Sequence, residues 1–289
     1  MKEGGQKLNI GIVGLGLIGG SLSAAFHNAG HKVFGCDRDK KTQDFALMAG
    51  TIDYELTDES IMDCDIIFIA ITLTQAEKWL SEKADLINKN ALVIDCCGVK
   101  RAICKVGKEL SDANGFGFIG GHPMAGKQVG GFKNSSRDLF DGATFCLVPN
   151  DKNDIRLLMK AKNILEDAGF KKYIVMTPDE HDRVIAFTSQ MAHLISNAYI
   201  KSDIAEAEEV AALSGGAFRD MTRVAYLDEA MWTELFMENS DNLLSQLDSF
   251  MAELSRYKEA IESKNTGILS DLLTDGKERK QMIEEKKNR

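Results

Sequence analysis

A histidine flanked by glycines is the first residue whose type and setting suit acid–base chemistry. It is His122, in the segment Gly120–Gly126, which reads G-G-H-P-M-A-G. The proline after it favours an extended backbone at the histidine, and glycines let the chain pass close to a ligand. The ordinary pKa of histidine lies near neutral pH, so His122 is a candidate general base. The alternative is a turn histidine that bonds only to backbone groups.

Two further histidines lie in one helical stretch, in settings that favour other roles. His193 stands in the apolar sequence Q-M-A-H-L-I-S, and this context alone favours a histidine of the hydrophobic core. His181 lies among four charged residues in a first helical turn, so we expect a solvated surface residue there.

Two arginines, Arg219 and Arg223, follow a break of two glycines in the helical pattern. Residues four apart share a helix face, and arginine binds carboxylates through two parallel hydrogen bonds. The pair therefore indicates a pocket for an anionic small-molecule substrate. The alternative is a surface pair that bridges to Asp220 or Glu229.

The most informative motif lies near the N-terminus, where I-G-I-V-G-L-G-L-I-G-G-S carries the G-x-G-x-x-G pattern of a dinucleotide-binding βαβ unit. Gly14 permits the tight turn after the strand. Gly16 lets the backbone approach a pyrophosphate at the helix N-terminus, and Gly19 lets helix and strand pack closely.

An acidic residue supports this interpretation. Asp37 ends the next strand, about 20 residues beyond the glycines, where a carboxylate binds the adenosine ribose and repels a 2′-phosphate. We therefore predict NAD rather than NADP, a preference that the neighbouring Arg38 could soften. The residues predicted to bind the cofactor are Gly14, Gly16, Leu17, Ile18, Gly19, Asp37, Arg38 and Thr72.

Alternating strands and helices position these motifs. Apolar runs at residues 65–72 and 91–96 are typical of strands buried on both faces of a parallel sheet. Shorter strands are expected at 116–119, 143–148 and 173–175, and helices at 39–49, 74–87, 99–110 and 153–168. This alternation predicts an α/β fold with a doubly wound, Rossmann-type parallel sheet. Ligands of such sheets bind at the carboxyl ends of the strands, and His122 should lie just beyond one of them.

The pattern changes at Thr177, where T-P-D-E predicts a helix start. Thr177 would be the N-cap, Pro178 the first helical residue and Glu180 the capping-box partner. After Pro178 the sequence contains no further proline, and apolar residues recur at helical spacing. We predict a dinucleotide-binding domain at 1–176 and an all-helical domain at 177–289 that binds substrate and forms a homodimer.

Composition excludes several classes of function. A chain of 289 residues predicts two domains. A net charge of −9 argues against nucleic acid as a partner. The sequence has no apolar run of about 18 residues for a membrane span, and no signal core. Its six cysteines show no metal-ligand spacing. We expect a cytoplasmic protein without a bound metal.

Taken together, these motifs resemble the prephenate/arogenate dehydrogenase family of tyrosine biosynthesis, from about Leu8 to about Leu254. The segments G-H-P-M-A-G and F-R-D-M-T-R are specific to it. The resemblance implies oxidative decarboxylation of prephenate: the C4 hydride passes to NAD, and the ring carboxylate leaves as CO2 to give 4-hydroxyphenylpyruvate. It implies that His122 is the catalytic histidine. His193 would then be a second histidine at the substrate, against the preference from its context, and Arg223 would hold a substrate carboxylate.

The chain departs from the family pattern at three positions. Gly98 stands where many members have a serine that orients the substrate hydroxyl, with Cys97 beside it. Gln190 replaces a histidine of many members, and Gln128 replaces a glutamate. We place Gly98 and Gln190 at the substrate site, where they bear on substrate preference.

Three alternatives remain open at this point. The first is an arogenate or dual-specificity cyclohexadienyl dehydrogenase. The second is a β-hydroxyacid dehydrogenase, whose helical domain carries a catalytic lysine, whereas this chain has none between Pro178 and Ile200. The third is a non-catalytic NAD-sensing regulator, which only Gly98 favours.

Overall fold

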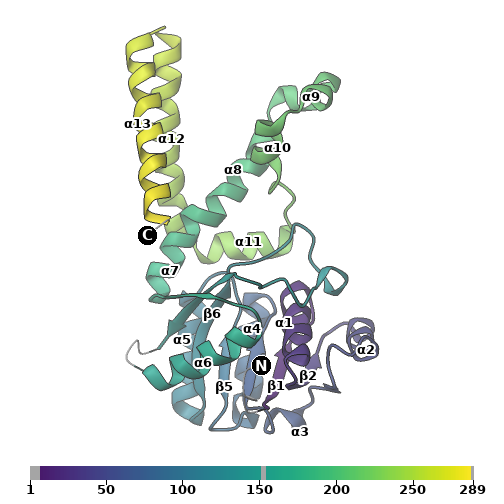
Figure 1. Ribbon diagram of the computed structural model, residues 1–289. Coiled ribbons are helices and arrows are strands. Elements are labelled where there is room, and N and C mark those ends of the chain that lie inside the picture. The colour runs from purple at the N-terminus through teal and green to yellow at the C-terminus, as the bar shows by residue number, and fades with distance from the viewer. Residues whose placement is uncertain (1–6, 151–153, 288–289) are drawn as a thin grey trace. The chain divides into compact units, whose positions relative to one another are not determined.

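The computed structural model describes residues 7–150 and 154–287. The chain divides into two compact units, Met1–Asn239 and Ser240–Arg289. The first unit holds the sheet and the helices up to α11, and the second is a pair of helices (Figure 1). The domain boundary predicted at residue 176 lies inside the first unit, and it stays a prediction.

One eight-stranded sheet forms the centre of the first unit, in the order β3-β2-β1-β4-β5-β6-β7-β8. Its strands are β1 (Asn9–Val13), β2 (Lys32–Cys36), β3 (Tyr54–Glu55), β4 (Ile66–Ile69), β5 (Leu92–Asp95), β6 (Gly117–Pro123), β7 (Thr144–Pro149) and β8 (Lys172–Val175). Every residue of β4 and β5 is buried. The apolar runs in the sequence therefore indicated the central strands correctly.

The sheet is parallel as predicted except at one pair, because β6 and β7 are antiparallel. The segment between these strands, residues 124–143, contains no α-helix and only one short 3₁₀-helix, η2 (Phe132–Asn134). A parallel pair needs a crossover, usually a helix, whereas an antiparallel pair needs none. The sheet is therefore mixed, although all of its other pairs are parallel.

Helices cover both faces of the sheet (Figure 1). They are α1 (Leu17–Asn28), α2 (Lys40–Met48), α3 (Asp58–Ile61), α4 (Leu73–Lys83), α5 (Arg101–Asn114) and α6 (Ile155–Asp167). One buried cluster joins α1 and α6 to the sheet, and a second joins α4 and α5 to its other face. This two-sided arrangement is a doubly wound fold, as the sequence predicted.

The helical segment begins where the sequence placed it. Thr177 and Glu180 form the predicted capping box, with Pro178 in the first turn. Helix α7 (Pro178–Ile185) continues through a π-helical turn, η3 (Ala186–Gln190), into α8 (Met191–Tyr199). The rest of the unit consists of η4 (Asp203–Glu206), α9 (Glu208–Leu213), α10 (Gly216–Thr222) and α11 (Glu229–Glu238).

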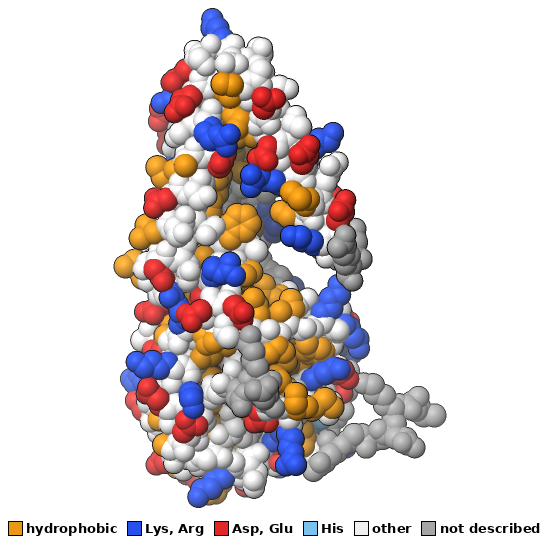
Figure 2. All heavy atoms as spheres, turned by 90° about the vertical axis from the view of Figure 1, so that its left-hand side faces the viewer, with side chains coloured by type: hydrophobic (Ala, Val, Ile, Leu, Met, Phe, Trp, Pro, Cys, Tyr) orange, Lys and Arg blue, Asp and Glu red, His pale blue; other side chains and the backbone are white. Residues whose placement is uncertain are grey.

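The second unit consists of α12 (Ser240–Glu262) and α13 (Thr266–Lys287), which pack side by side. Tyr257 donates a hydrogen bond across the pair to the carbonyl of Leu272, at 3.1 Å. Large apolar side chains remain exposed along it: Leu244, Met251, Leu254, Ile261, Ile268, Leu273, Met282 and Ile283. Figure 2 shows hydrophobic side chains among charged ones in the upper, helical part of the view.

In the part of the chain that the structure describes, no helix is both long enough and apolar enough to cross a membrane.

Candidate active site

The glycine-rich turn between β1 and α1 has the predicted geometry. Gly14 has a φ of +87°, which favours glycine. A Cβ atom there would lie 2.4 Å from a side-chain atom of Ile71 and 2.6 Å from the carbonyl oxygen of Ala70. The turn therefore packs directly against the end of β4.

The next two glycines of the motif differ in what surrounds them. A Cβ atom at Gly19 would lie 1.8 Å from the carbonyl oxygen of Gly14, so the start of α1 sits directly on the turn. A Cβ atom at Gly16 would meet nothing within 4 Å. The backbone at Gly16 therefore faces open space, and a pyrophosphate could approach it closely.

The first turn of α1 supplies groups for such an anion. Leu17 and Ile18 are its first residues, and the first N–H groups of a helix have no partner within the helix. They favour a negatively charged group at this end. Leu17 and Ile18 would therefore contribute to such a site through their backbone N–H groups, which a search for polar side chains would miss.

Asp37 connects the end of β2 to this turn. Its Oδ2 accepts a hydrogen bond from the Leu15 N–H at 2.8 Å, and its Oδ1 accepts one from the Asp39 N–H, also at 2.8 Å. A carboxylate oxygen can accept more than one bond, so the half-buried Asp37 can also receive ribose hydroxyls. Arg38 beside it is exposed, and exposed Thr72 is the N-cap of α4. The structure thus brings the predicted cofactor residues together at the carboxyl ends of β1, β2 and β4, and they fit a dinucleotide.

His122 lies within β6, which corrects the prediction that it follows the strand. It pairs with Cys146 of β7, near the carboxyl end of β6. Gly121 lies inside this strand, at a position where a neighbouring segment leaves no room for a side chain: a Cβ atom there would lie 2.3 Å from the carbonyl oxygen of Asp95. The glycines before His122 therefore serve strand packing rather than a turn.

A buried ion pair fixes the backbone beside His122. Asp95, the last residue of β5, accepts hydrogen bonds from the N–H groups of Cys97 and Gly121 and from the ammonium group of Lys100. Lys100 also donates to the carbonyl of Gly121 at 2.7 Å. Burial acts to lower the pKa of Lys100, but the carboxylate of Asp95 outweighs it and the pKa is raised. A positive charge therefore lies close to His122.

His181 is buried against His122, contrary to the prediction of a surface residue. Its side chain is 1% exposed. Its Nε2 lies 2.9 Å from Nδ1 of His122, and its Nδ1 lies 2.7 Å from Oδ1 of Asp182. The two imidazoles and the carboxylate form a continuous chain, with His122 at its half-buried end.

Asp182 is anchored in turn by the N-terminus of α5. Its two oxygens accept the backbone N–H groups of Lys100 and Arg101, at 2.7 and 3.0 Å. The guanidinium of Arg101 lies 3.4 Å from Oδ2. The sequence predicted no role for these residues, yet they orient the carboxylate.

The pKa values of this chain follow from its burial. Burial lowers the pKa of His122 well below its ordinary value, and repulsion from Lys100, and from His181 whenever that ring is protonated, acts in the same direction. Burial also lowers the pKa of His181, despite the opposing effect of Asp182. Burial acts to raise the pKa of Asp182, but its hydrogen bonds from His181 and Arg101 outweigh this and the pKa is lowered. At neutral pH both imidazoles are therefore neutral and Asp182 is ionised.

Gln190 and Gly98 both lie against helix α11, where they contact Leu235. The Gln190 amide donates to the carbonyl of Leu235 and accepts from the amide of Asn239, each at 2.8 Å. A Cβ atom at Gly98 would lie 3.0 Å from a methyl group of Leu235. Leu235 therefore occupies the space next to Gly98, and a direct role of either predicted residue at the substrate stays a prediction.

His193 and Arg223 lie on neighbouring helical elements. The ring of His193 packs against that of Trp232, with centroids 4.0 Å apart and the planes tilted by 32°, and its Nδ1 donates a hydrogen bond to the Ser189 carbonyl at 2.9 Å. Burial lowers the pKa of His193, and the charge of Arg223 contributes to the shift. The half-buried His193 is therefore close enough to Arg223 to sense its charge.

Arg223 is exposed. Among the described residues no carboxylate lies within ion-pair distance of its guanidinium. Its backbone carbonyl accepts a hydrogen bond from Gln128 at 2.5 Å. Because Gln128 follows His122 by six residues, this bond links the segment after β6 to the end of α10. Arg219, its predicted partner, is likewise exposed.

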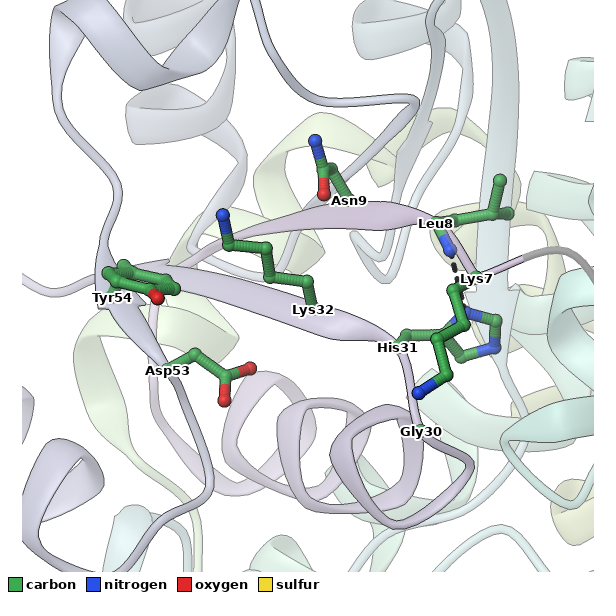
Figure 3. Close-up of a pocket in the computed structure, with 8 residues that line it drawn as sticks. All are labelled: Lys7, Leu8, Asn9, Gly30, His31, Lys32, Asp53 and Tyr54. Carbon is green, nitrogen blue, oxygen red and sulfur yellow. Dashed lines mark hydrogen bonds between the residues drawn. The ribbon is translucent and has the colours of Figure 1, made fainter.

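A separate surface pocket of about 370 Å3 lies at the opposite end of β1 and β2 (Figure 3). Its lining residues are Lys7, Leu8, Asn9, Gly30, His31, Lys32, Asp53 and Tyr54. It lies at the amino ends of the strands, away from the glycine-rich turn. It is therefore not the predicted cofactor site.

Comparison with known families matches most of the chain. A family model described as "Prephenate dehydrogenase, nucleotide-binding domain" matches residues 22–182. A second, described as "Prephenate dehydrogenase, dimerization domain", matches residues 177–275.

Individual relatives agree with these matches. A prephenate dehydrogenase of Lactococcus lactis subsp. cremoris is 28% identical over 281 residues, which are 94% of this chain and 77% of the relative. A structure of prephenate dehydrogenase from A. aeolicus, in complex with hydroxyphenyl propionate and NAD+, has a TM-score of 0.84 and 27% identity, and the match covers 97% of this chain and 100% of that one. Synechocystis arogenate dehydrogenase has a TM-score of 0.81 and 27% identity, with 96% and 100% covered.

Proposed function

Because the chain belongs to the prephenate dehydrogenase family, we propose that it catalyses the NAD-dependent oxidative decarboxylation of prephenate to 4-hydroxyphenylpyruvate. The observation that supports this most is the setting of His122. It is a neutral imidazole on the side of the sheet where the parallel strands end, which is also the side of the glycine-rich turn. One of its ring nitrogens is hydrogen-bonded to His181. NAD, when bound, supplies the hydride acceptor.

His122 acts as the general base in this proposal. Its lowered pKa keeps the ring unprotonated at neutral pH, so it can take the proton of the C4 hydroxyl. The O–H electron pair then forms the C4 carbonyl as the hydride leaves C4. Loss of the ring carboxylate as CO2 makes the ring aromatic and drives the reaction forward.

Arg223 binds a carboxylate of the substrate, and His193 lies beside it. Arginine favours carboxylates through its planar, doubly donating fork. In the described part of the chain this guanidinium has no competing carboxylate within ion-pair distance. A site for a dianion in a chain of net charge −9 needs such a local positive group.

NAD is the preferred cofactor because Asp37 lies where a 2′-phosphate would otherwise be bound. Its carboxylate is held toward the turn by the N–H groups of Leu15 and Asp39. A phosphate there would meet a fixed negative charge.

Arogenate is the second candidate substrate, since a similar structure is an arogenate dehydrogenase. Arogenate carries an amine in place of the side-chain keto group, so a few polar contacts decide between the two. The test is kcat/KM for prephenate and for arogenate, each with NAD and with NADP. A higher kcat/KM for prephenate with NAD supports the proposal, and turnover of arogenate alone overturns its substrate assignment.

The helical part of the chain forms a homodimer in this proposal. The matched dimerization domain extends to residue 275, and exposed apolar side chains line α12 and α13. The location in the cytoplasm stays a prediction from the sequence.

A further inference from the structure

We propose that His181 and Asp182 are positioning residues that act through His122, by fixing its ring in the tautomer with hydrogen on Nδ1 and none on Nε2. This inference rests on the proposed function, in which His122 is the base. It names Nε2 as the atom that takes the substrate proton.

The tautomer follows from the hydrogen-bond partners, starting at the carboxylate. An ionised carboxylate only accepts hydrogen bonds. Nδ1 of His181, 2.7 Å from Asp182, must therefore carry the hydrogen. A neutral imidazole has one N–H group, so Nε2 of His181 carries none and is an acceptor. Nδ1 of His122, 2.9 Å from that nitrogen, must then be the donor.

The hydrogen bonds run in this one direction because Asp182 can only be an acceptor. Both of its oxygens already accept backbone N–H groups of Lys100 and Arg101, and the Arg101 guanidinium adds positive charge. Protonating Asp182 would place a donor against these donors. Its side chain is 1% exposed, so water is not available to replace them.

The charged groups around the two imidazoles favour the same arrangement. The positive charge of Lys100, at the start of α5, disfavours protonation of either ring. Lys100 is paired with Asp95, at the end of β5. Arg101 contacts Asp182 from α5, while Asp182 itself belongs to α7 with His181. With neutral rings, only one assignment of hydrogens satisfies both contacts.

The arrangement also serves the imidazolium that forms in the reaction. When the hydroxyl proton moves to Nε2 of His122, Nδ1 keeps its hydrogen and continues to donate to His181. No bond in the chain must be remade at that step. His181 and Asp182 therefore hold the base ready before the reaction and stabilise its charged form during it.

The direct test is the tautomer itself, read by 15N NMR of the full chain labelled at its five histidines. The His122 signals are assigned as those that vanish in His122→Asn. We expect the Nδ1 signal of a protonated nitrogen and the Nε2 signal of a bare one at neutral pH. The opposite pattern in the wild type overturns the proposal, whatever the substrate proves to be.

Kinetics of three variants provide a second test. His181→Phe keeps an aromatic ring but removes the acceptor, so we expect kcat to fall roughly 10- to 100-fold, the scale found when a metal-bound histidine loses its hydrogen-bond partner, with unchanged NAD affinity. His181→Gln restores an acceptor oxygen and should recover part of the loss. His31→Phe is the matched control, because His31 is buried and bonds Asp167 at 3.2 Å far from the site.

The two tests separate failure of this inference from failure of the proposed function. If neither prephenate nor arogenate is turned over, the NMR result alone decides whether the hydrogens of the histidine pair are placed as described. If His181→Phe does not fold, the wild-type spectrum and His181→Gln still decide. A fall in kcat equal to that of His31→Phe would mean that His181 is merely structural.

Discussion

Gly16 and Gly19 belong to one motif, but the structure predicts that alanine at each position fails for a different reason. A Cβ atom at Gly16 meets nothing within 4 Å, and φ there is −72°, which alanine tolerates. We expect Gly16→Ala to cost less than about 1.5 kcal/mol of stability, the scale of a changed helix N-cap. Its methyl group instead fills the space where the pyrophosphate must approach.

The loss of affinity can be worked out from that overlap. Forcing an extra methyl group into a closely packed contact costs about 1–3 kcal/mol, and about 1.4 kcal/mol corresponds to a tenfold change in Kd. We therefore expect Gly16→Ala to bind NAD roughly 5- to 150-fold more weakly, with a Tm close to that of the wild type.

Gly19→Ala is the matched comparison. Its methyl group would lie 1.8 Å from the carbonyl oxygen of Gly14, so α1 must move off the turn. We expect a stability loss of about 3 kcal/mol or more, visible as a lower Tm without any ligand. Thermal unfolding and NAD titration of both proteins check this. Wild-type NAD affinity in a folded Gly16→Ala protein would refute the assignment of the pyrophosphate to this turn.

Three further predictions concern the site. Asp37→Asn should weaken NAD binding and improve the relative use of NADP, measured as the ratio of kcat/KM for the two cofactors; an unchanged ratio would count against the ribose assignment. Arg223→Ala should raise KM for prephenate roughly 10- to 150-fold, the scale of one or two charge-assisted hydrogen bonds at about 1.5–3 kcal/mol, and an unaltered KM would contradict its role. Because burial lowers the pKa of His122, the acidic limb of the kcat/KM profile should have its midpoint below 6.5, whereas a midpoint above 6.5 would show that the ring is not held neutral.

Local signals in the sequence were sufficient for much of the fold. The helix at Pro178 was predictable because a capping box involves residues only three apart, and the structure contains it. Asp37 was predictable as a neighbour of the glycines because the βαβ unit fixes that geometry. The central strands β4 and β5 were predictable from their unbroken apolar runs.

What the sequence missed depends on contacts between distant segments. His181 has charged neighbours and looks solvated, but a helix buries it against β6, 59 residues away in the chain. One signal was present: His181 lies four residues before Ile185, and these positions share a helix face. The end of β6 was also misplaced, because the need for glycine at position 121 comes from the backbone of Asp95, a distant segment that leaves no room for a side chain there.

The central claim is that His122 removes the hydroxyl proton while hydride passes to NAD. The most direct measurement compares kcat for wild type and His122→Asn, followed as NADH absorbance with saturating prephenate and NAD, together with the Kd for NAD. The account predicts a fall in kcat of roughly 10²- to 10⁴-fold, the usual scale for a lost general base, with the Kd unchanged. Equal rates for the two proteins would contradict it.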